Sequence, residues 1–258
     1  NLPNDATGQI SISINGITNT SAIKNGASTT VIHQRLANGT YPVEITYSGS
    51  YKYNSKKVTK QVNITKITPN MNVVVVDDEI NVGEDLIIDV SGLPDDANVK
   101  YVNVIGDITV NGLIKDGSAR IVISNLTEGK YSFTVIYNGD DRYDRKQSDV
   151  EKVSVNKLPV DMKVIAKNID IGEDLSMQII LPSDITGEFV DIFINDEEYS
   201  SMVIDGNAIA TIPGLTNGTY NYTVYYYGND KYEPDEYESF VEVGKISIDY
   251  NVTIKDIY

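Results

Sequence analysis

One stretch in the middle of the chain decides the fold. Residues 129–143 read Gly-Lys-Tyr-Ser-Phe-Thr-Val-Ile-Tyr-Asn-Gly-Asp-Asp-Arg-Tyr. Apolar residues occupy every second position from Tyr131 to Tyr137, with Ser132 and Thr134 between them, which is the period of a strand with one buried face. The Asn-Gly-Asp-Asp segment that follows is rich in turn residues. The stretch therefore predicts a half-buried strand that ends in a turn.

The same stretch occurs three times in the chain. Its copies begin at Gly39, Gly129 and Gly218, which are 90 and 89 residues apart. A fixed period of this kind is the signature of a repeat protein. A Gly-Glu-Asp segment at residues 83–85 and 172–174 also recurs, but the first copy lacks it. Each copy has a Leu-Pro corner: Leu2-Pro3, Leu93-Pro94 and Leu181-Pro182.

The alternation of apolar and polar residues in the second repeat predicts about seven short strands. Strands separated by turns every 8 to 12 residues are typical of an antiparallel sandwich. The predicted spans are 72–76, 85–90, 99–104, 108–113, 119–123, 130–137 and 149–155. We therefore predict an all-β protein, with tandem immunoglobulin-like antiparallel β-sandwiches arranged end to end.

The repeats predict the domain boundaries. Residues 1–66 are an incomplete repeat that lacks its first strands, and residues 67–157 and 158–245 are complete repeats. Residues 246–258 match the first strand of a further repeat, because Ile246 to Ile254 again alternates apolar with polar residues. We expect this strand to stay exposed or to pair with another molecule. The joints lack Gly/Ser linkers and contain Pro69 and Pro159, which predicts short, semi-rigid connections.

The composition excludes several classes of partner. The chain has 37 acidic and 21 basic residues and a net charge of -16, a field that repels phosphate backbones and anionic lipid heads. Nucleic acid is therefore not an expected partner. No apolar run reaches the roughly 20 residues of a membrane span, so this segment predicts no direct membrane insertion. Without cysteine, disulfides and thiolate chemistry are excluded.

The sequence predicts no enzyme, no catalytic residue and no cofactor. The single histidine, His33, aligns with the inward-facing Ile123 and Ile212, which predicts a neutral histidine in the core or at its rim. One histidine and no cysteine cannot build the common nucleophilic or zinc sites. Carboxylate pairs for glycoside chemistry remain open, but the acidic residues concentrate in turns.

Calcium is the metal that the acidic turns favour, since hard cations bind several oxygen ligands. The alternative is that Asp and Asn are ordinary turn residues on an acidic surface, as the carboxylate-free Ser48-Gly-Ser50 of the first repeat suggests. The candidate ligands are Asp140, Asp141, Asp144, Asp230 and Glu233.

Two further kinds of surface residue are candidates. Asn-x-Ser/Thr sequences are possible glycosylation sites, although an Asn-, Ser- and Thr-rich chain also produces them by chance. They occur at Asn19, Asn38, Asn63, Asn125, Asn217, Asn221 and Asn251. Tyr51, Tyr225 and Tyr227 can stack on sugars or another protein, or cover the edge of a sandwich.

The repeated run from Gly129 to Tyr143 resembles bacterial-type immunoglobulin-like repeats of large prokaryotic surface adhesin-like proteins, and in character those of methanogenic archaea most of all. The resemblance implies an extracellular, cell-surface stalk. The tyrosines two residues after each repeated glycine, Tyr41, Tyr131 and Tyr220, resemble the tyrosine corner, whose hydroxyl bonds to upstream backbone. Because the chain has neither cysteine nor tryptophan, only the sandwich architecture of antibody domains carries over.

Three function classes follow. The first is a structural stalk that projects a distal binding region from the cell, which near-identical turns in all repeats favour. The second is a subunit of an extracellular filament or sheath that assembles head to tail by strand addition. The third is a carbohydrate- or protein-binding module with a site in its loops. The expected partners are neighbouring repeats, other copies head to tail, and an unknown cell-surface ligand.

Overall fold

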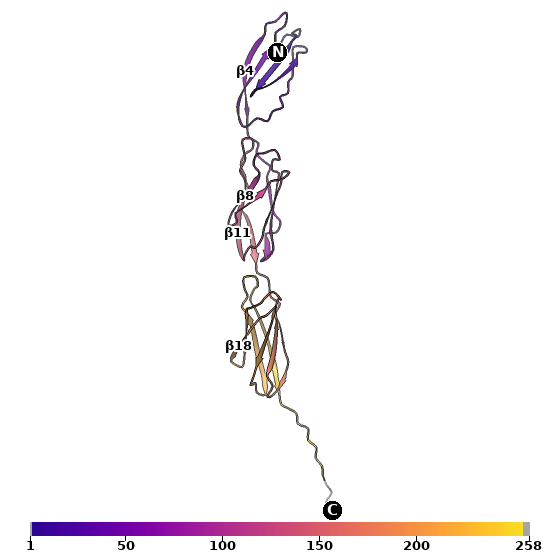
Figure 1. Cartoon of the computed structure of the whole chain (residues 1–258), viewed down its shortest axis with the longest axis vertical. Coiled ribbons are helices and arrows are strands. Elements are labelled where there is room, and N and C mark those ends of the chain that lie inside the picture. Colours follow the sequence, from indigo (N-terminus) through magenta and orange to yellow (C-terminus); the bar gives the residue numbers. More distant parts are fainter. Residues whose placement is uncertain (1, 255–258) are drawn as a thin grey trace, which may run out of the picture. The chain divides into compact units, whose positions relative to one another are not determined.

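The computed structural model describes residues 2–254, which form strands joined by turns and loops, with no helix among them (Figure 1). The first 64 residues contain one sheet, in the order β2-β1-β3-β4, with every pair antiparallel. Asn15 and Gly16 connect β1 to β2 with φ of 46° and 80°, the left-handed geometry that a tight hairpin requires. The strands are β1 (Gln9–Ile14), β2 (Ile17–Ala22), β3 (Gly39–Tyr47) and β4 (Lys56–Ile64).

The second repeat has two sheets, ordered β10-β7-β5 and β6-β13-β11-β8-β9, and β12 pairs with β11. All seven predicted strands are present, with bounds that differ by a few residues. The strands are β5 (Asn72–Val75), β6 (Glu79–Asn81), β7 (Leu86–Ser91), β8 (Tyr101–Gly106), β9 (Val110–Leu113), β10 (Ala119–Ile123), β11 (Gly129–Tyr137), β12 (Lys146–Gln147) and β13 (Glu151–Asn156).

The third repeat has the same two sheets, ordered β14-β16-β19 and β15-β21-β20-β17-β18. Its strands are β14 (Lys163–Ala166), β15 (Ile169–Asp170), β16 (Leu175–Ile180), β17 (Phe189–Ile194), β18 (Glu197–Met202), β19 (Asn207–Ile212), β20 (Gly218–Tyr226) and β21 (Asp235–Gly244). Fully buried residues of both sheets, such as Met177 and Val224, belong to one hydrophobic core. The fold class is confirmed: the chain is all-β and consists of tandem immunoglobulin-like repeats.

Three short strands, β6, β12 and β15, were not predicted by the sequence. β6 pairs with β13 and β15 with β21, and both pairs are parallel, so each of these sheets is mixed at one edge. A strand of two or three residues is too short to show a period of two, which explains why the alternation did not predict it.

The first repeat differs from the other two at the segment that corresponds to β10 and β19. Residues 28–33 form no strand, and the Thr30 hydroxyl instead lies 2.5 Å from that of Ser21 on β2. The prediction that His33 lies in the core or at its rim is wrong, because His33 is exposed. β10 pairs with β7, and β19 pairs with β16. Residues 2–64 contain no strand equivalent to β7 or β16, so no neighbouring strand holds residues 28–33 in register.

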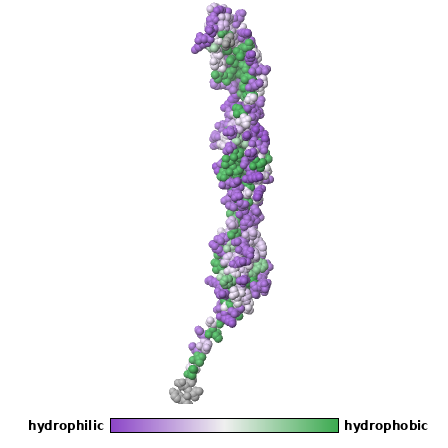
Figure 2. Space-filling model, turned by 180° about the vertical axis from the view of Figure 1, so that it is seen from behind, coloured by the Kyte–Doolittle hydropathy of each residue, from purple (hydrophilic) through white to green (hydrophobic). Residues whose placement is uncertain are grey.

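The predicted strand at Ile246 forms no strand between residues 246 and 254. Its apolar side chains are exposed, with Ile248 at 82% and Ile254 at 86%, and Figure 2 shows hydrophobic residues on its surface. β5 and β14, at the equivalent place, pair with β7 and β16 of their own repeats. The last four positions of the predicted strand, 255–258, lie outside the described residues.

The chain divides into two compact units, and the division runs through the second repeat. The first unit contains the chain up to Asp78 together with Leu86–Ile123 and Tyr131–Val153. The second contains Glu79–Asp85, Ser124–Lys130 and the chain from Ser154 onward. The repeat boundaries at residues 66, 157 and 245 stay a prediction.

Candidate functional site

The most regular polar site is built on the turn that follows the long central strand of each repeat. Gly49, Gly139 and Gly228 open these turns with φ of 83°, 72° and 75°. A Cβ on Gly139 would lie 2.6 Å from the Tyr143 carbonyl oxygen, and one on Gly228 would lie 2.7 Å from that of Tyr232. Only glycine fits the left-handed backbone and the close approach together.

The residue after each glycine caps the turn with its side chain. Asp140 Oδ1 accepts hydrogen bonds from the N–H groups of Arg142 and Tyr143 at 2.8 and 2.9 Å. Asn229 Oδ1 accepts the equivalent two bonds at 2.8 and 2.7 Å. In the first repeat the Ser50 hydroxyl makes longer contacts of 3.4 and 3.2 Å. Aspartate, asparagine and serine therefore all serve one structural purpose at this position.

The tyrosine that closes each turn bonds to an aspartate from the Leu-Pro corner. The Tyr143 hydroxyl donates to Asp96 Oδ1 at 2.6 Å, and Arg142 donates from both terminal nitrogens to Asp96 Oδ2 at 3.0 Å. The same triad occurs in each repeat, and we call it the aspartate–tyrosine cluster. Its members are Asp5, Lys52 and Tyr53; Asp96, Arg142 and Tyr143; and Asp184, Lys231 and Tyr232.

The cation of each cluster also lies near the ring of its tyrosine. Lys52 Nζ, Arg142 Cζ and Lys231 Nζ lie 5.4, 5.2 and 5.0 Å from the ring centroid of the following tyrosine. These distances are within the range of a cation–π contact. Each cation is thus shared between a carboxylate and an aromatic face.

Hydrogen bonding shifts the pKa values of the cluster. The Tyr143 hydroxyl and the Arg142 guanidinium hold the pKa of Asp96 below its usual value. Lys231 and Tyr232 do the same for the pKa of Asp184, and Lys52 and Tyr53 for that of Asp5. The hydrogen bond to Asp96 raises the pKa of Tyr143. At neutral pH the aspartate is ionised and the tyrosine is neutral. In this state the tyrosine hydroxyl donates to the carboxylate and joins the turn to the Leu-Pro corner.

The repeated stretch of sequence ends at Tyr143, but its pattern did not predict the aspartates of the cluster. A signal was present, because each aspartate follows the leucine of the Leu-Pro corner by three residues. Sequence periodicity cannot show that this corner meets a turn about 47 residues further on. The pairing depends on tertiary contact.

The connections between repeats are anchored on the same turns. β4 ends at Ile64, and Ile67 donates its N–H to the Arg142 carbonyl at 2.9 Å while accepting from the N–H of Asp144 at 3.0 Å. In the third repeat, Leu158 makes the equivalent bonds with Lys231 and Glu233 at 2.8 and 2.9 Å. Each turn therefore holds the first residues of its own repeat in place.

Carboxylates of the acidic turns are engaged in hydrogen bonds within the chain. Asp140 uses both carboxylate oxygens on backbone N–H groups, with Oδ2 accepting from Asn98 at 2.8 Å, and Asp144 accepts from the Thr68 hydroxyl at 2.9 Å. Within residues 2–254, no three His, Asp or Glu side chains gather closely enough to hold a metal ion. Asp141, Asp230 and Glu233, the other predicted ligands, belong to no such group. Calcium binding stays a prediction.

The predicted tyrosine corners have the expected short-range contacts in two repeats. The Tyr41 hydroxyl donates to the Ala37 carbonyl at 3.1 Å. The Tyr220 hydroxyl accepts from the Thr216 N–H at 3.1 Å and lies 2.9 Å from the Thr216 hydroxyl. Tyr131 occupies the same place in the second repeat. Each of these partners precedes its tyrosine by four residues, and the tyrosine corners stay a prediction.

Six of the seven predicted glycosylation sites are exposed, and only Asn19 is half-buried. Side chains at three of the seven sites make hydrogen bonds: Asn217 donates to the Val243 carbonyl at 2.7 Å, Asn19 donates to the Val31 carbonyl at 2.5 Å, and Asn63 accepts from the Thr40 hydroxyl at 2.7 Å. Modification of Asn217 would have to break its bond to β21. Glycosylation stays a prediction.

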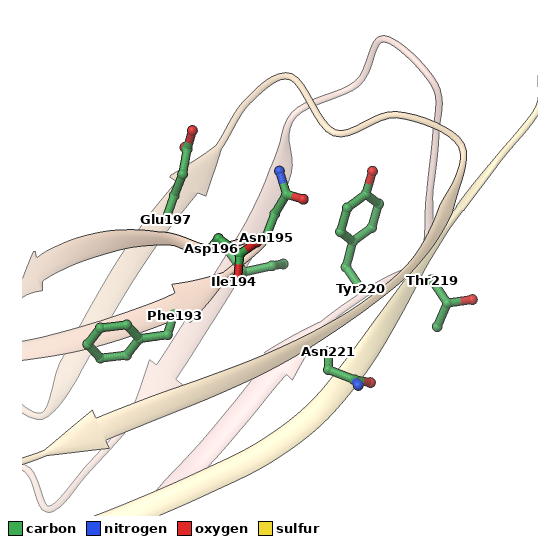
Figure 3. Close-up of a pocket in the computed structure, with 8 residues that line it drawn as sticks. All are labelled: Phe193, Ile194, Asn195, Asp196, Glu197, Thr219, Tyr220 and Asn221. Carbon is green, nitrogen blue, oxygen red and sulfur yellow. The ribbon is translucent and has the colours of Figure 1, made fainter.

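A shallow pocket lies at one end of the larger sheet of the third repeat. Figure 3 shows its lining side chains on β17, on the β17–β18 turn and on the start of β20. It contains two carboxylates and no basic residue, so the lining pairs no acid with a base. The lining residues are Phe193, Ile194, Asn195, Asp196, Glu197, Thr219, Tyr220 and Asn221.

The sheets and the repeated turns define a tandem array of immunoglobulin-like sandwiches. No helix in residues 2–254 has the length and apolar character needed to cross a membrane. No protein-family model and no curated protein matches the sequence.

Distant likenesses to solved structures exist. Fibronectin(III)-like modules of Clostridium thermocellum CbhA match at 16% identity and a TM-score of 0.28, covering 72% of this chain and 100% of that one. SGBP-B of Bacteroides ovatus, solved with a mixed-linkage heptasaccharide, matches at 15% identity and a TM-score of 0.22, covering 95% of this chain and 66% of that one. Yersinia pseudotuberculosis adhesin InvE matches at 14% identity and a TM-score of 0.32, covering 67% of this chain and 59% of that one. At these TM-scores the likenesses carry no argument, and the fold class rests on the sheet topology.

Proposed function

We propose that the chain is part of the structural stalk of a cell-surface, adhesin-like protein and that it projects a distal binding region. No residue of the segment is catalytic in this proposal. Its location is extracellular, where glycans on exposed asparagines would shield the repeats. The same turn, corner and cluster recur about every 90 residues, which supports a scaffold role for the whole segment.

The short joints carry the proposal. Only residues 65 and 66 separate the end of β4 from Ile67, which is already bonded to the turn of the second repeat, and only Lys157 separates β13 from Leu158. A link of one or two residues with hydrogen bonds beyond it has little freedom to swing, in contrast to a Gly/Ser linker. A stalk needs such joints, because a flexible chain would not hold a distal region away from the cell.

Spin labels test the joints directly, since the chain contains no cysteine. Thr18→Cys with Asn111→Cys places labels at exposed positions of the first and second repeats, and Asn111→Cys with Glu198→Cys spans the second and third. We expect a narrow distance distribution by electron–electron double resonance for both pairs. A Gly-Ser insertion after Lys66 or Lys157 is the matched control and should broaden the distribution. Broad distributions without any insertion would refute the stalk.

The second candidate function is a filament or sheath subunit that assembles by strand addition. The exposed alternation of Ile246 to Ile254 favours it, since an unpaired amphipathic segment is a template for pairing. Sedimentation over a range of concentrations tests it. Association that Ile248→Asp abolishes would support this candidate, and a monomer at every concentration would dismiss it.

A further inference from the structure

The outer face of the larger sheet in the third repeat presents a group of aromatic rings. Phe189, Phe193 and Tyr227 are exposed to 55%, 38% and 64%, and Tyr225 is half-buried. We call these four residues the aromatic face. Single exposed apolar residues are common on protein surfaces, whereas contiguous groups of them mark interaction sites.

The rings are contiguous. Phe193 and Tyr225 meet edge to face with centroids 5.7 Å apart, and Tyr225 and Tyr227 lie 6.3 Å apart with their planes 18° from parallel. Phe189 and Tyr227 border a common depression at the other end of the face. The four rings therefore form one strip across β17 and β20.

Carboxylates lie beside the strip on the strands that form this sheet face. Asp191 lies between the two phenylalanines on β17, Glu198 pairs across the strands with Phe193, and Glu236 pairs with Tyr225. The sequences of β17, β18, β20 and β21 contain no lysine, arginine or histidine. The aromatic face therefore has a strongly negative rim.

The phenol groups keep this charge pattern at neutral pH. The Tyr225 hydroxyl donates to Glu236 Oε1 at 2.7 Å, and this bond raises the pKa of Tyr225. Desolvation and the neighbouring Asp191 raise the pKa of Tyr227. Both rings are neutral, with the negative π faces that attract cations.

The aromatic face is not a general feature of the repeats. The equivalents of Phe193, Tyr225 and Tyr227 are Ile105, Ile136 and Asn138 in the second repeat and Ser13, Thr46 and Ser48 in the first. The second repeat folds into the same two sheets without these rings. Folding of the sandwich therefore does not require them.

We propose that the aromatic face binds an extended, cationic segment of another protein. Its lysine or arginine side chains lie over the rings and pair with Asp191, Glu198 and Glu236. Alternate residues of an extended strand point the same way about 6.6–6.8 Å apart, which matches the 6.3 Å between Tyr225 and Tyr227. A neutral glycan would gain nothing from the charge of the rim, and an anionic polymer would be repelled. This inference is independent of the stalk proposal.

The experiment measures fluorescence anisotropy of a labelled peptide of alternating lysine and threonine with the full chain. We expect saturable binding that weakens as salt is added. Tyr227→Ser should weaken it roughly fivefold, and Glu198→Gln with Glu236→Gln by a similar factor. Asp77→Asn with Asp78→Asn is the matched control, since it removes the same charge from an exposed site in the second repeat and should leave affinity unchanged.

Several outcomes would overturn the proposal. Equal weakening by the control pair would mean attraction to the net charge alone. The proposal would be wrong if the peptide did not bind. It would also be wrong if a neutral glucan oligosaccharide, in place of the peptide, bound in a way that depends on Tyr227. Self-association of the chain that requires Tyr227 would make a second copy the occupant. Circular dichroism of each variant checks that the sandwich remains folded.

Discussion

The first sheet and the larger sheet of the third repeat have equivalent strands but different cores. Ile192 and Val224 are completely buried in the third repeat, whereas their counterparts Ile12 and Ile45 are half-buried in the first. The smaller sheet β14-β16-β19 provides the opposite layer in the third repeat, and residues 2–64 contain only one sheet. Equivalent sequence patterns therefore produce equivalent strands, but burial depends on the layer packed against them.

The segment that corresponds to β19 shows the same dependence on a partner. Ile212 is fully buried because β19 pairs with β16, while His33 at the matching position is exposed on a segment without a strand. Strand pairing, rather than local preference, decides which side of this segment faces inward.

The largest effect should come from a matched pair of core substitutions. Ile192→Ala should lower the stability of the third repeat by about 2–5 kcal/mol, because it leaves a cavity in a closed core. Ile12→Ala should cost roughly half of that or less, since Ile12 is already partly in contact with water. Hydrogen exchange read by mass spectrometry, sheet by sheet, measures both. Equal losses would mean that the first sheet is as well covered as the third repeat.

A pair of glycine substitutions sharpens the comparison at the turns. Gly228→Ala should cost at least about 1 kcal/mol more than Gly187→Ala. Both have left-handed φ, 75° and 80°, but only at Gly228 would the new Cβ meet backbone, whereas nothing lies within 4 Å at Gly187. Calorimetry of the two variants tests this. Similar melting temperatures would show that backbone strain alone matters and that the close approach relaxes.

The aspartate–tyrosine cluster should make stability depend on pH. The pKa of Asp184 is lowered by Lys231 and Tyr232, so its carboxylate stabilises the folded state above the unfolded-state pKa of about 3.9. That stability is lost as the pH falls through the lower, folded-state pKa. The Tm should therefore drop by a few degrees below about pH 4, and Asp184→Asn should show a smaller drop. An identical acid profile in the variant would remove the cluster from the explanation.

The sequence predicted the strands and the central core but not the site. Alternation over nine residues, as in β11 and β20, identifies both a strand and its buried face. The partners of that strand are set at long range. Asp96 and Asp184 were therefore not predicted, and the predicted position of His33 was wrong. The aromatic face was partly visible, since Tyr225 and Tyr227 were recognised, but Phe193 lies on another strand and register cannot be read from one sequence.

The smallest expected effect is the change in the free energy of unfolding when a buried tyrosine hydroxyl is removed, and its sign differs between the second and third repeats. Tyr226 donates its hydroxyl to Glu188 at 2.6 Å and Tyr47 donates to the Thr7 carbonyl at 2.8 Å, whereas the buried Tyr137 hydroxyl has no hydrogen-bond partner. An unsatisfied buried hydroxyl costs free energy, so Tyr137→Phe should raise the free energy of unfolding by about 0.5 kcal/mol, and Tyr226→Phe should lower it by about 1 kcal/mol.

Burial also raises the pKa of Tyr137 to about 12. A raised pKa means that the folded state disfavours the phenolate, so the stability of the fold is lost as the pH rises from the unfolded-state pKa of about 10 toward 12. Chemical denaturation followed at neutral and alkaline pH therefore measures both effects. Tyr137→Phe should be the more stable protein at neutral pH and should lose less stability above pH 10 than the unsubstituted chain. A loss at neutral pH would show that the Tyr137 hydroxyl finds a partner, such as a water molecule, and that the second repeat is no worse satisfied than its neighbours.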